Sequence, residues 1–204
     1  MIENEIKYVL KLTTNPDDIG GDVEQNFPAH ISQGYLDKSA RIRKTQFQAP
    51  VGLKLRDPFY KFTYKFALPT GEVEEFEKSI GQDEFDRCFE LAQNKLFKHR
   101  YTFKHDGAQW DLDYFYDPNG TLYFVMAECE MPSGWDKPKS LPKVIRDNIL
   151  MVVDRNNSAQ YSSKKISNVE YAKSLISVFT KVEKVKPRKT RESMREARAA
   201  LLSK

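Results

Sequence analysis

The chain has 204 residues, of which 40% are hydrophobic and 30% are charged, and its formal net charge is +4. This balance is typical of one globular domain with a sizeable core, and it excludes collagen-like and wholly disordered classes. No apolar run approaches the roughly 20 residues of a membrane span, and the alternating charges of residues 1–10 are unlike a signal peptide. Two separated cysteines, Cys88 and Cys129, predict no disulfide framework and favour a reducing, cytoplasmic location.

Strand signals dominate the chain. Seven segments alternate polar and apolar residues with the period of two that indicates strands. They are residues 2–10, 40–43, 60–68, 73–80, 97–104, 110–115 and 122–131. Helices are predicted over residues 83–95, within part of 139–153, and over 167–179. Residues 13–32 indicate a loop, and the Asp-Pro-Asn-Gly sequence at 117–120 predicts a hairpin turn.

The positive charge is concentrated at the end of the chain. Residues 181–204 hold nine Lys or Arg and three Asp or Glu, a net charge of +6. Residues 1–180 hold the other 24 basic and 26 acidic residues, a net charge of −2. We therefore predict a nearly neutral body, 1–180, and a basic tail, 181–204, that is helical from Arg191 to Leu202. A solvated helix is the favoured interpretation of the tail, and contact with nucleic acid is the alternative.

The polar faces of the predicted strands carry pairs of like charge, which is unusual for a solvated sheet face. These pairs are Arg41 and Arg43, Glu75 and Glu77, Lys98 and Arg100, Asp111 and Asp113, and Glu128 and Glu130. Like charges on one face repel unless opposite charges or a ligand offset them. A barrel with this face inward would have an acidic side suited to divalent cations and a basic side suited to phosphate.

A series of short motifs, taken in chain order, resembles the CYTH superfamily, also called triphosphate tunnel metalloenzymes. The first is ExExK at residues 3–7. Segments similar to the family motifs IxQGYL, VRIR, TIK, ExE, KTRY, WEVDVF and AEIE follow at 31–36, 40–43, 63–65, 75–77, 98–101, 110–115 and 127–130. The resemblance covers roughly residues 1–131. It implies an α+β fold for the body, with eight antiparallel strands closed into a barrel, or tunnel, and helices packed outside.

The resemblance also implies a role for each charged residue inside that tunnel. The triphosphate would be bound by Arg41, Arg43, Lys65, Lys98 and Arg100. Mg²⁺ or Mn²⁺ would be held by Glu3, Glu5, Asp113, Glu128 and Glu130, with Glu75 and Glu77 on an acidic wall. Glu3, Glu5 and Lys7 would be catalytic, and Lys7 would order the attacking water. Val73 stands where the family often has arginine, and Lys61 is the candidate to replace that base.

These features favour a metal-dependent triphosphatase, a hydrolase of phosphoric anhydride bonds in inorganic triphosphate or a nucleoside triphosphate. The partner is then a small molecule that contains a triphosphate, and no membrane partner is expected. One alternative is a non-catalytic module that binds a nucleotide or polyphosphate, and another is a class IV-type adenylate cyclase. The choice of triphosphate, the metal and the oligomeric state stay open at this point.

The histidines and cysteines carry no predicted chemistry. His30, His99 and His105 are too scattered along the sequence to indicate a zinc site, and His99 falls on the apolar face of its segment. Cys129 likewise alternates with Glu128 and Glu130, so its side chain is expected to point away from the charged face.

Overall fold

The computed structural model describes residues 4–19, 28–48, 56–68 and 73–183. Contacts within the chain divide it into two units, 1–173 and 174–204, and each is considered by itself. The first unit holds every strand found among the described residues. Of the second, residues 174–183 are described and form the later part of a helix, whereas the predicted helix from Arg191 to Leu202 lies outside the described residues.

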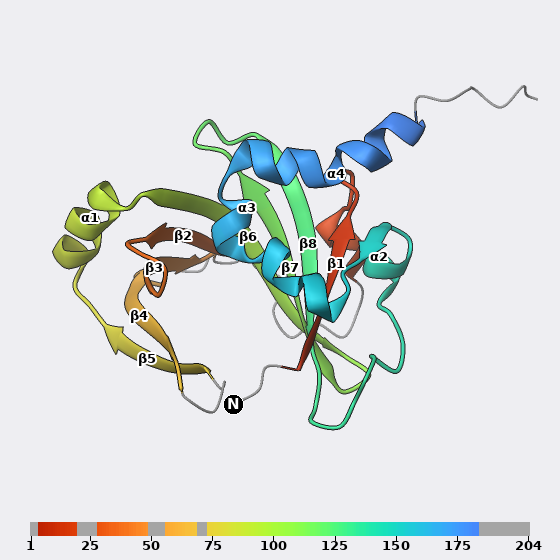
Figure 1. Cartoon of the computed structure of the whole chain (residues 1–204), viewed down its shortest axis with the longest axis horizontal. Helices are drawn as coiled ribbons and strands as arrows, with labels where there is room; N and C mark the ends of the chain where they lie inside the picture. Colours follow the sequence, from red (N-terminus) through yellow and green to blue (C-terminus); the bar gives the residue numbers. More distant parts are fainter. Residues whose placement is uncertain (1–3, 20–27, 49–55, 69–72, 184–204) are drawn as a thin grey trace, which may run out of the picture. The chain divides into compact units, whose positions relative to one another are not determined.

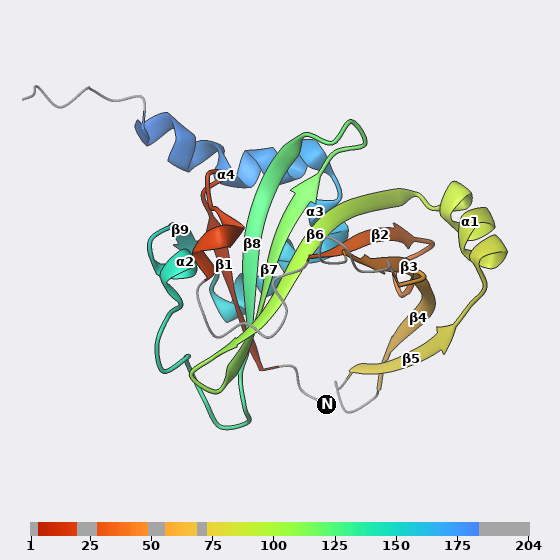
Figure 2. The same ribbon diagram turned by 180° about the vertical axis from the view of Figure 1, so that it is seen from behind.

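The first unit is built on one antiparallel sheet that curls strongly (Figures 1 and 2). Its nine strands have the order β5-β4-β3-β2-β6-β7-β8-β1-β9. Their bounds are β1 Glu5–Leu10, β2 Ala29–Tyr35, β3 Ala40–Phe47, β4 Phe59–Ala67, β5 Val73–Ser79, β6 Asn94–His105, β7 Ala108–Tyr116, β8 Leu122–Glu130 and β9 Ile149–Val152. All seven segments predicted as strands are therefore confirmed, and so is the hairpin turn between β7 and β8.

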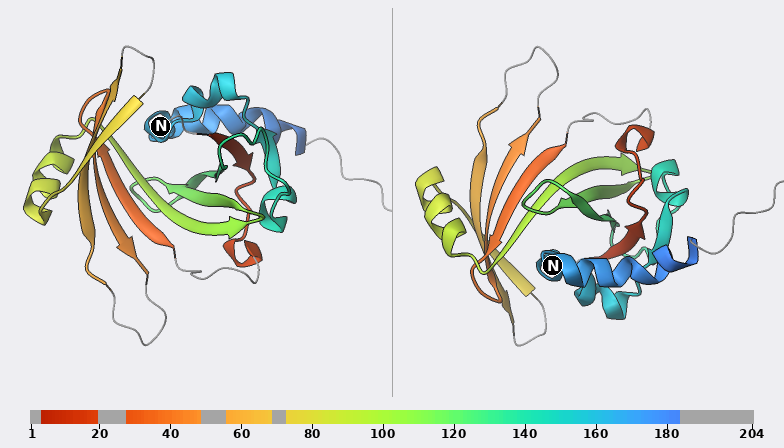
Figure 3. Two further views of the ribbon diagram at one scale, coloured as in Figure 1. Left: turned by 90° about the horizontal axis from the view of Figure 1, so that it is seen from below. Right: turned by 90° about the horizontal axis from the view of Figure 1, so that it is seen from above.

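The helices are few and mostly short, so the fold class is α+β, as predicted. Their bounds are η1 Pro16–Ile19, α1 Gln82–Leu91, α2 Lys143–Arg146, η2 Arg155–Tyr161, α3 Ser163–Ile166 and α4 Val169–Glu183, where η marks a 3₁₀ helix. Figure 3 shows α1 against the outside of the strands β2 to β4, the half of the sheet that it covers. Within the described part of the chain, no helix is long and apolar enough to cross a membrane.

The predicted closure into an eight-stranded barrel is not confirmed. Among the described residues, β5 and β9 are the two edges of the sheet, and no hydrogen-bonded ladder joins them. The ninth strand comes from residues 139–153, where the prediction was a helix over part of the segment. The structure has the short helix α2 there, and β9 follows it. The apolar run Ile149–Val152 has no polar alternation to distinguish a strand from a helix, and its pairing with β1 decides the outcome.

The hydrophobic core lies on the face of the sheet opposite to the charged side chains. Trp110, Leu112 and Tyr114 of β7 are buried in a cluster with Tyr8 of β1 and Ile145 of α2. Because strand side chains alternate, the neighbouring carboxylates on β7 point to the other, concave face. Burial of these large apolar side chains thus determines which face of the sheet holds the charges.

Gly34 in β2 allows α1 to lie directly on the sheet. A Cβ atom at this position would be 2.8 Å from the Cβ of Ala92 and 3.1 Å from the Phe89 ring. We expect Gly34→Ala to lower the free energy of unfolding by about 1–3 kcal/mol, the usual cost of overpacking. Urea denaturation measures it, and adding Ala92→Gly should recover part of the loss because the two sites are in contact. A Gly34→Ala protein as stable as the parent would contradict this close approach.

Candidate functional site

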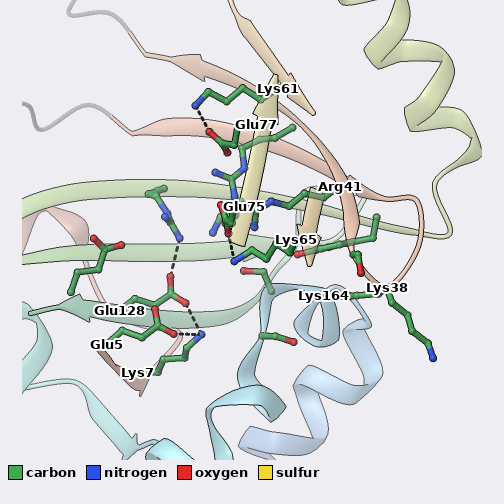
Figure 4. Close-up of a pocket in the computed structure, with 18 residues that line it drawn as sticks. Glu5, Lys7, Lys38, Arg41, Lys61, Lys65, Glu75, Glu77, Glu128 and Lys164 are labelled. Atoms are coloured by element: carbon green, nitrogen blue, oxygen red, sulfur yellow. Dashed lines mark hydrogen bonds and ion pairs between the residues drawn. The ribbon is translucent and has the colours of Figure 1, made fainter. Parts of the chain in front are cut away.

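The concave face of the curled sheet encloses a strongly charged cavity of about 650 Å³ (Figure 4). Eighteen residues line it, nine of them basic and five acidic, which leaves a surplus of four positive charges. The basic residues are Lys7, Lys38, Arg41, Arg43, Lys61, Lys65, Lys98, Arg100 and Lys164, and the acidic ones are Glu5, Glu75, Glu77, Glu128 and Glu130. The structure thus brings together every predicted site residue except Asp113, which lies beneath the wall, and Glu3, which lies outside the described residues.

Asp113 is fully buried and is engaged by two cations. The Nζ atom of Lys98 donates to its Oδ2 at 2.6 Å, and Arg100 donates from Nε to Oδ1 at 2.7 Å and from Nη2 to Oδ2 at 2.6 Å. Burial acts to raise the pKa of Asp113, but the charges of Arg100 and Lys98 outweigh it and lower the pKa to about 2. Burial and the nearby Arg100 lower the pKa of Lys98 to about 8. Asp113 therefore carries a charge that holds two basic residues in place.

Arg100 is surrounded by carboxylates on two further sides. Its Nη1 donates to Asp111, and its Nη2 also donates to Oε2 of Glu128 at 3.1 Å. Asp111 in turn accepts a hydrogen bond of 2.6 Å from Oγ1 of Thr102. These partners follow from the register, which places Arg100 opposite Asp113 and Thr102 opposite Asp111. Because these hydrogen bonds already fix the guanidinium, it loses little further conformational freedom when a phosphate binds.

Arg43 differs from the other arginines on the wall because its described partner is neutral. Its Nε donates to Oε1 of Gln33 at 2.8 Å, and the amide of Gln33 donates to the Tyr35 hydroxyl. Among the described residues, no carboxylate forms an ion pair with Arg43. Burial, and the positive charges of Arg41 and Arg100, lower the pKa of Arg43 to about 10. An anion in the cavity would relieve this unfavourable burial of charge.

On one wall of the cavity, basic side chains of β3 and β4 lie next to acidic side chains of β5. Lys65 forms an ion pair with Glu75, Arg41 lies 3.7 Å from Glu75, and Lys61 lies 2.7 Å from Glu77. The register places Lys65 directly opposite Glu75. Glu75 and Glu77 thus lie on the cavity wall, where they partly neutralise the neighbouring bases. Lys61 lines the cavity. It must do so if it replaces the arginine that the family often has and that this sequence lacks.

The opposite side of the cavity holds Lys7 between two carboxylates. Its Nζ lies 3.0 Å from Oε1 of Glu5 and 3.0 Å from Oε1 of Glu128 (Figure 4). Burial acts to lower the pKa of Lys7, but Glu128 and Glu5 raise it above its usual value. For Glu128, burial is outweighed by Arg100 and Lys7, and its pKa is lowered. Lys7 and Glu128 are therefore both charged at neutral pH.

Glu130 lies directly opposite Glu5 in the sheet and has no cationic partner among the described residues. Its Oε2 accepts a hydrogen bond of 3.2 Å from the Gln109 amide. Partial burial raises the pKa of Glu130, and the charges of Asp111, Glu128 and Glu5 add to the effect. Glu130 therefore brings to this end of the cavity a carboxylate that forms no ion pair with any of the described residues.

The donor chemistry of Glu5, Glu128 and Glu130 fits a hard divalent cation, because Mg²⁺ and Mn²⁺ prefer carboxylate oxygens. The uncompensated charge of Glu130 favours such an ion. In the described part of the chain, however, no three His, Cys, Asp or Glu residues already surround a possible metal position. The ammonium of Lys7 lies between two of the acids instead, so binding of a cation there requires Lys7 to turn away.

Several cavity residues carry no signal in the sequence. Lys38 and Ser39 lie in the turn between β2 and β3, and Ser162, Ser163 and Lys164 come from the start of α3. Lys164 donates to the backbone oxygen of Asp37, which brings these two segments together. Neither segment has strand periodicity, so their place on the cavity wall depends on the tertiary fold.

No protein-family model matches the chain, and a search of curated proteins found no match. Among solved structures, the chain is similar to the crystal structure of a putative adenylate cyclase from Bacillus halodurans. The identity is 16%, the alignment covers 79% of this chain and 98% of that chain, and the TM-score is 0.45. A likeness of this size supports no argument about activity, so the function has to be inferred from the side chains of the cavity.

Proposed function

We propose that the protein is a metal-dependent triphosphatase that hydrolyses inorganic triphosphate or a nucleoside triphosphate in the charged cavity. The observation that carries the proposal is the composition of the lining, with nine basic residues, five acidic residues and an arginine whose described partners include no acid. A triphosphate is a compact polyanion, and closely spaced Arg and Lys residues are its usual ligands. The sequence resemblance to the triphosphate tunnel enzymes supports the same activity independently.

The basic residues would bind and orient the substrate. Arg43, Arg41 and Lys98 would donate to phosphate oxygens, and Lys65 would contribute once the phosphate competes with Glu75. Arg100 would donate from a guanidinium that Asp113 already orients. Positioning and electrostatic stabilisation supply most of the rate in phosphoryl transfer, because the protein forms no covalent bond in the reaction.

The acidic side would hold the divalent cation through Glu5, Glu128 and Glu130, with Glu3 as a further ligand implied by the resemblance. When bound, such an ion neutralises phosphate charge and lowers the pKa of bound water. Displaced from the two acids, the Lys7 ammonium would donate to the attacking water and orient it. Water would attack the terminal phosphorus in line, the bond to the bridging oxygen would break, and one proton of the water would stay on each product, so that inorganic triphosphate yields hydrogen phosphate and hydrogen pyrophosphate.

Phosphate release tests the proposal most directly. The purified chain is incubated with inorganic triphosphate, ATP, GTP and RNA bearing a 5′-triphosphate, each with Mg²⁺ and with Mn²⁺. We expect release of orthophosphate or pyrophosphate that chelation by EDTA abolishes. Binding of these ligands without release would instead show a binding module, and cyclic AMP formed from ATP would show a cyclase.

A variant of Glu130 tests the acidic side separately. We expect Glu130→Gln to raise the Mg²⁺ concentration for half-maximal activity by about 10–100-fold, the usual range for disturbing a metal site. Glu74→Gln is the matched control, because Glu74 is an exposed acid on β5 outside the cavity lining. An unchanged Mg²⁺ dependence in Glu130→Gln would remove Glu130 from the proposed set of ligands.

A further inference from the structure

A second cavity, of about 390 Å³, lies on the other face of the sheet from the charged one. Strand alternation places it there, because Lys98 and Arg100 face the charged cavity and His99 between them faces away. Its lining includes His30, Phe97, His99 and Tyr116, together with Asp117 and Gly120 of the β7–β8 turn. Lys98 contributes to the lining of both cavities, and it is the one residue of this second lining to which the proposed triphosphatase reaction gives a role.

Two histidines from different strands meet in this cavity. His30 of β2 and His99 of β6 are directly opposite each other in the antiparallel register. Their ring centroids are 4.0 Å apart and their planes differ by 9°. Within the described residues, neither ring makes a hydrogen bond or an ion pair, so its nitrogens are available to a ligand. His30 is exposed and His99 is partly exposed, so solvent reaches the pair.

We propose that His30 and His99 together bind one divalent transition-metal ion, with Zn²⁺ as the representative, on the outer face of the sheet. Imidazole nitrogen suits Zn²⁺, Ni²⁺ and Cu²⁺, whereas Mg²⁺ prefers oxygen. The chemistry of this site therefore differs from that of the acidic side of the charged cavity, and the inference does not rest on the proposed hydrolysis.

The register allows the two side chains to share one ion. With Zn–N bonds of about 2.0–2.1 Å, two nitrogens on one tetrahedral ion lie about 3.3 Å apart, a separation within reach of side chains on directly opposite residues of neighbouring strands. In the stacked arrangement the lone pairs, which lie in the ring planes, run side by side, so both side chains must turn, and His99 must leave its contact with the Tyr116 ring, before the lone pairs converge on one ion. Among the described residues, no third His, Cys, Asp or Glu completes a group with them, so water in the cavity would fill the remaining positions.

Both rings are in the form that binds metals. Burial lowers the pKa of His30, and burial with the nearby His30 lowers the pKa of His99 to about 4. Both imidazoles are consequently neutral near pH 7, and no proton has to be removed before a metal binds.

Zinc titration of the full-length chain tests the proposal, with excess Mg²⁺ present to occupy carboxylates and no triphosphate added. We expect calorimetry to show one zinc ion per chain. We expect His30→Gln and His99→Gln each to weaken zinc binding by at least about tenfold, the least that disturbing a metal ligand usually costs. His105→Gln is the matched control, because His105 lies at the end of the same strand β6 and contacts Ser140.

Measurements on the unaltered chain guard against a variant that fails to fold. In NMR spectra, substoichiometric zinc should shift the ring signals of His30 and His99 before those of His105. Absence of zinc binding, or equal binding by the parent and both glutamine variants, would overturn the proposal. Ring shifts confined to His105 would overturn it too.

Discussion

Arg43→Gln is expected to lower kcat/KM for triphosphate hydrolysis by about 10²–10³-fold, equivalent to about 2.7–4 kcal/mol of transition-state stabilisation. The reason is the electrostatic state of Arg43 in the free protein. Its guanidinium is largely buried and donates to the neutral Gln33, with no carboxylate ion pair among the described residues. Its charge is therefore available to the phosphate without first breaking an ion pair. Steady-state kinetics with inorganic triphosphate measure the loss.

Lys61→Gln is the control for Arg43→Gln. Lys61 lines the same cavity and carries the same charge, but it is more exposed and lies 2.7 Å from Glu77. A phosphate must compete with that carboxylate, so we expect the loss of activity to be much smaller than for Arg43. Equal losses in the two variants would show that the total charge of the cavity, and not the unpaired state of Arg43, controls catalysis. Direct binding of triphosphate to each variant separates affinity from turnover.

Asp113→Asn is expected to lower the free energy of unfolding by about 3–5 kcal/mol, as removal of one member of a buried ion pair usually does. Asp113 has no exposed surface, and both of its oxygens accept hydrogen bonds from Lys98 and Arg100. An amide of the same shape leaves Lys98 buried without its neutralising charge. Urea denaturation at neutral pH measures the change, with Glu77→Gln at the exposed Lys61 pair expected to cost less than about 1 kcal/mol.

The same variant distinguishes two roles for Asp113. The sequence resemblance implies a metal ligand, whereas the hydrogen bonds of the structure favour a positioning role for Lys98 and Arg100. In the positioning role, Asp113→Asn raises KM for the triphosphate and leaves the Mg²⁺ concentration for half-maximal activity unchanged. A large rise in that Mg²⁺ concentration, with stability retained, would restore Asp113 to the metal ligands.

The strands and their charged faces could be predicted because strand geometry is local. Side chains two residues apart share a face whatever the sheet around them, so Arg41 and Arg43 had to lie together, as did Glu128 and Glu130. The apolar partners, such as Trp110 and Leu112, bury the other face by the hydrophobic effect alone. The α+β class and the charged strand residues of the cavity wall therefore followed from residue order, whereas the cavity residues from the β2–β3 turn and from the start of α3 did not.

The pairing of charges could not be predicted in the same way, because it depends on register and curvature. The sequence does not show that Glu75 lies opposite Lys65, that Lys7 lies between Glu5 and Glu128, or that Arg43 is left with a neutral partner. The ninth strand has the same origin, since β9 has no alternation and its pairing with β1 is a tertiary contact.

The histidines of the second cavity illustrate the same limit. His30 and His99 are far apart in the chain and look unrelated there, yet adjacent strands bring their rings to 4.0 Å. By itself, the sequence determined which side chains share a face of each strand, because alternation needs no long-range contact. Only the tertiary structure decided which strands meet, and thereby which of the described charges form ion pairs, which do not, and which two imidazoles lie side by side.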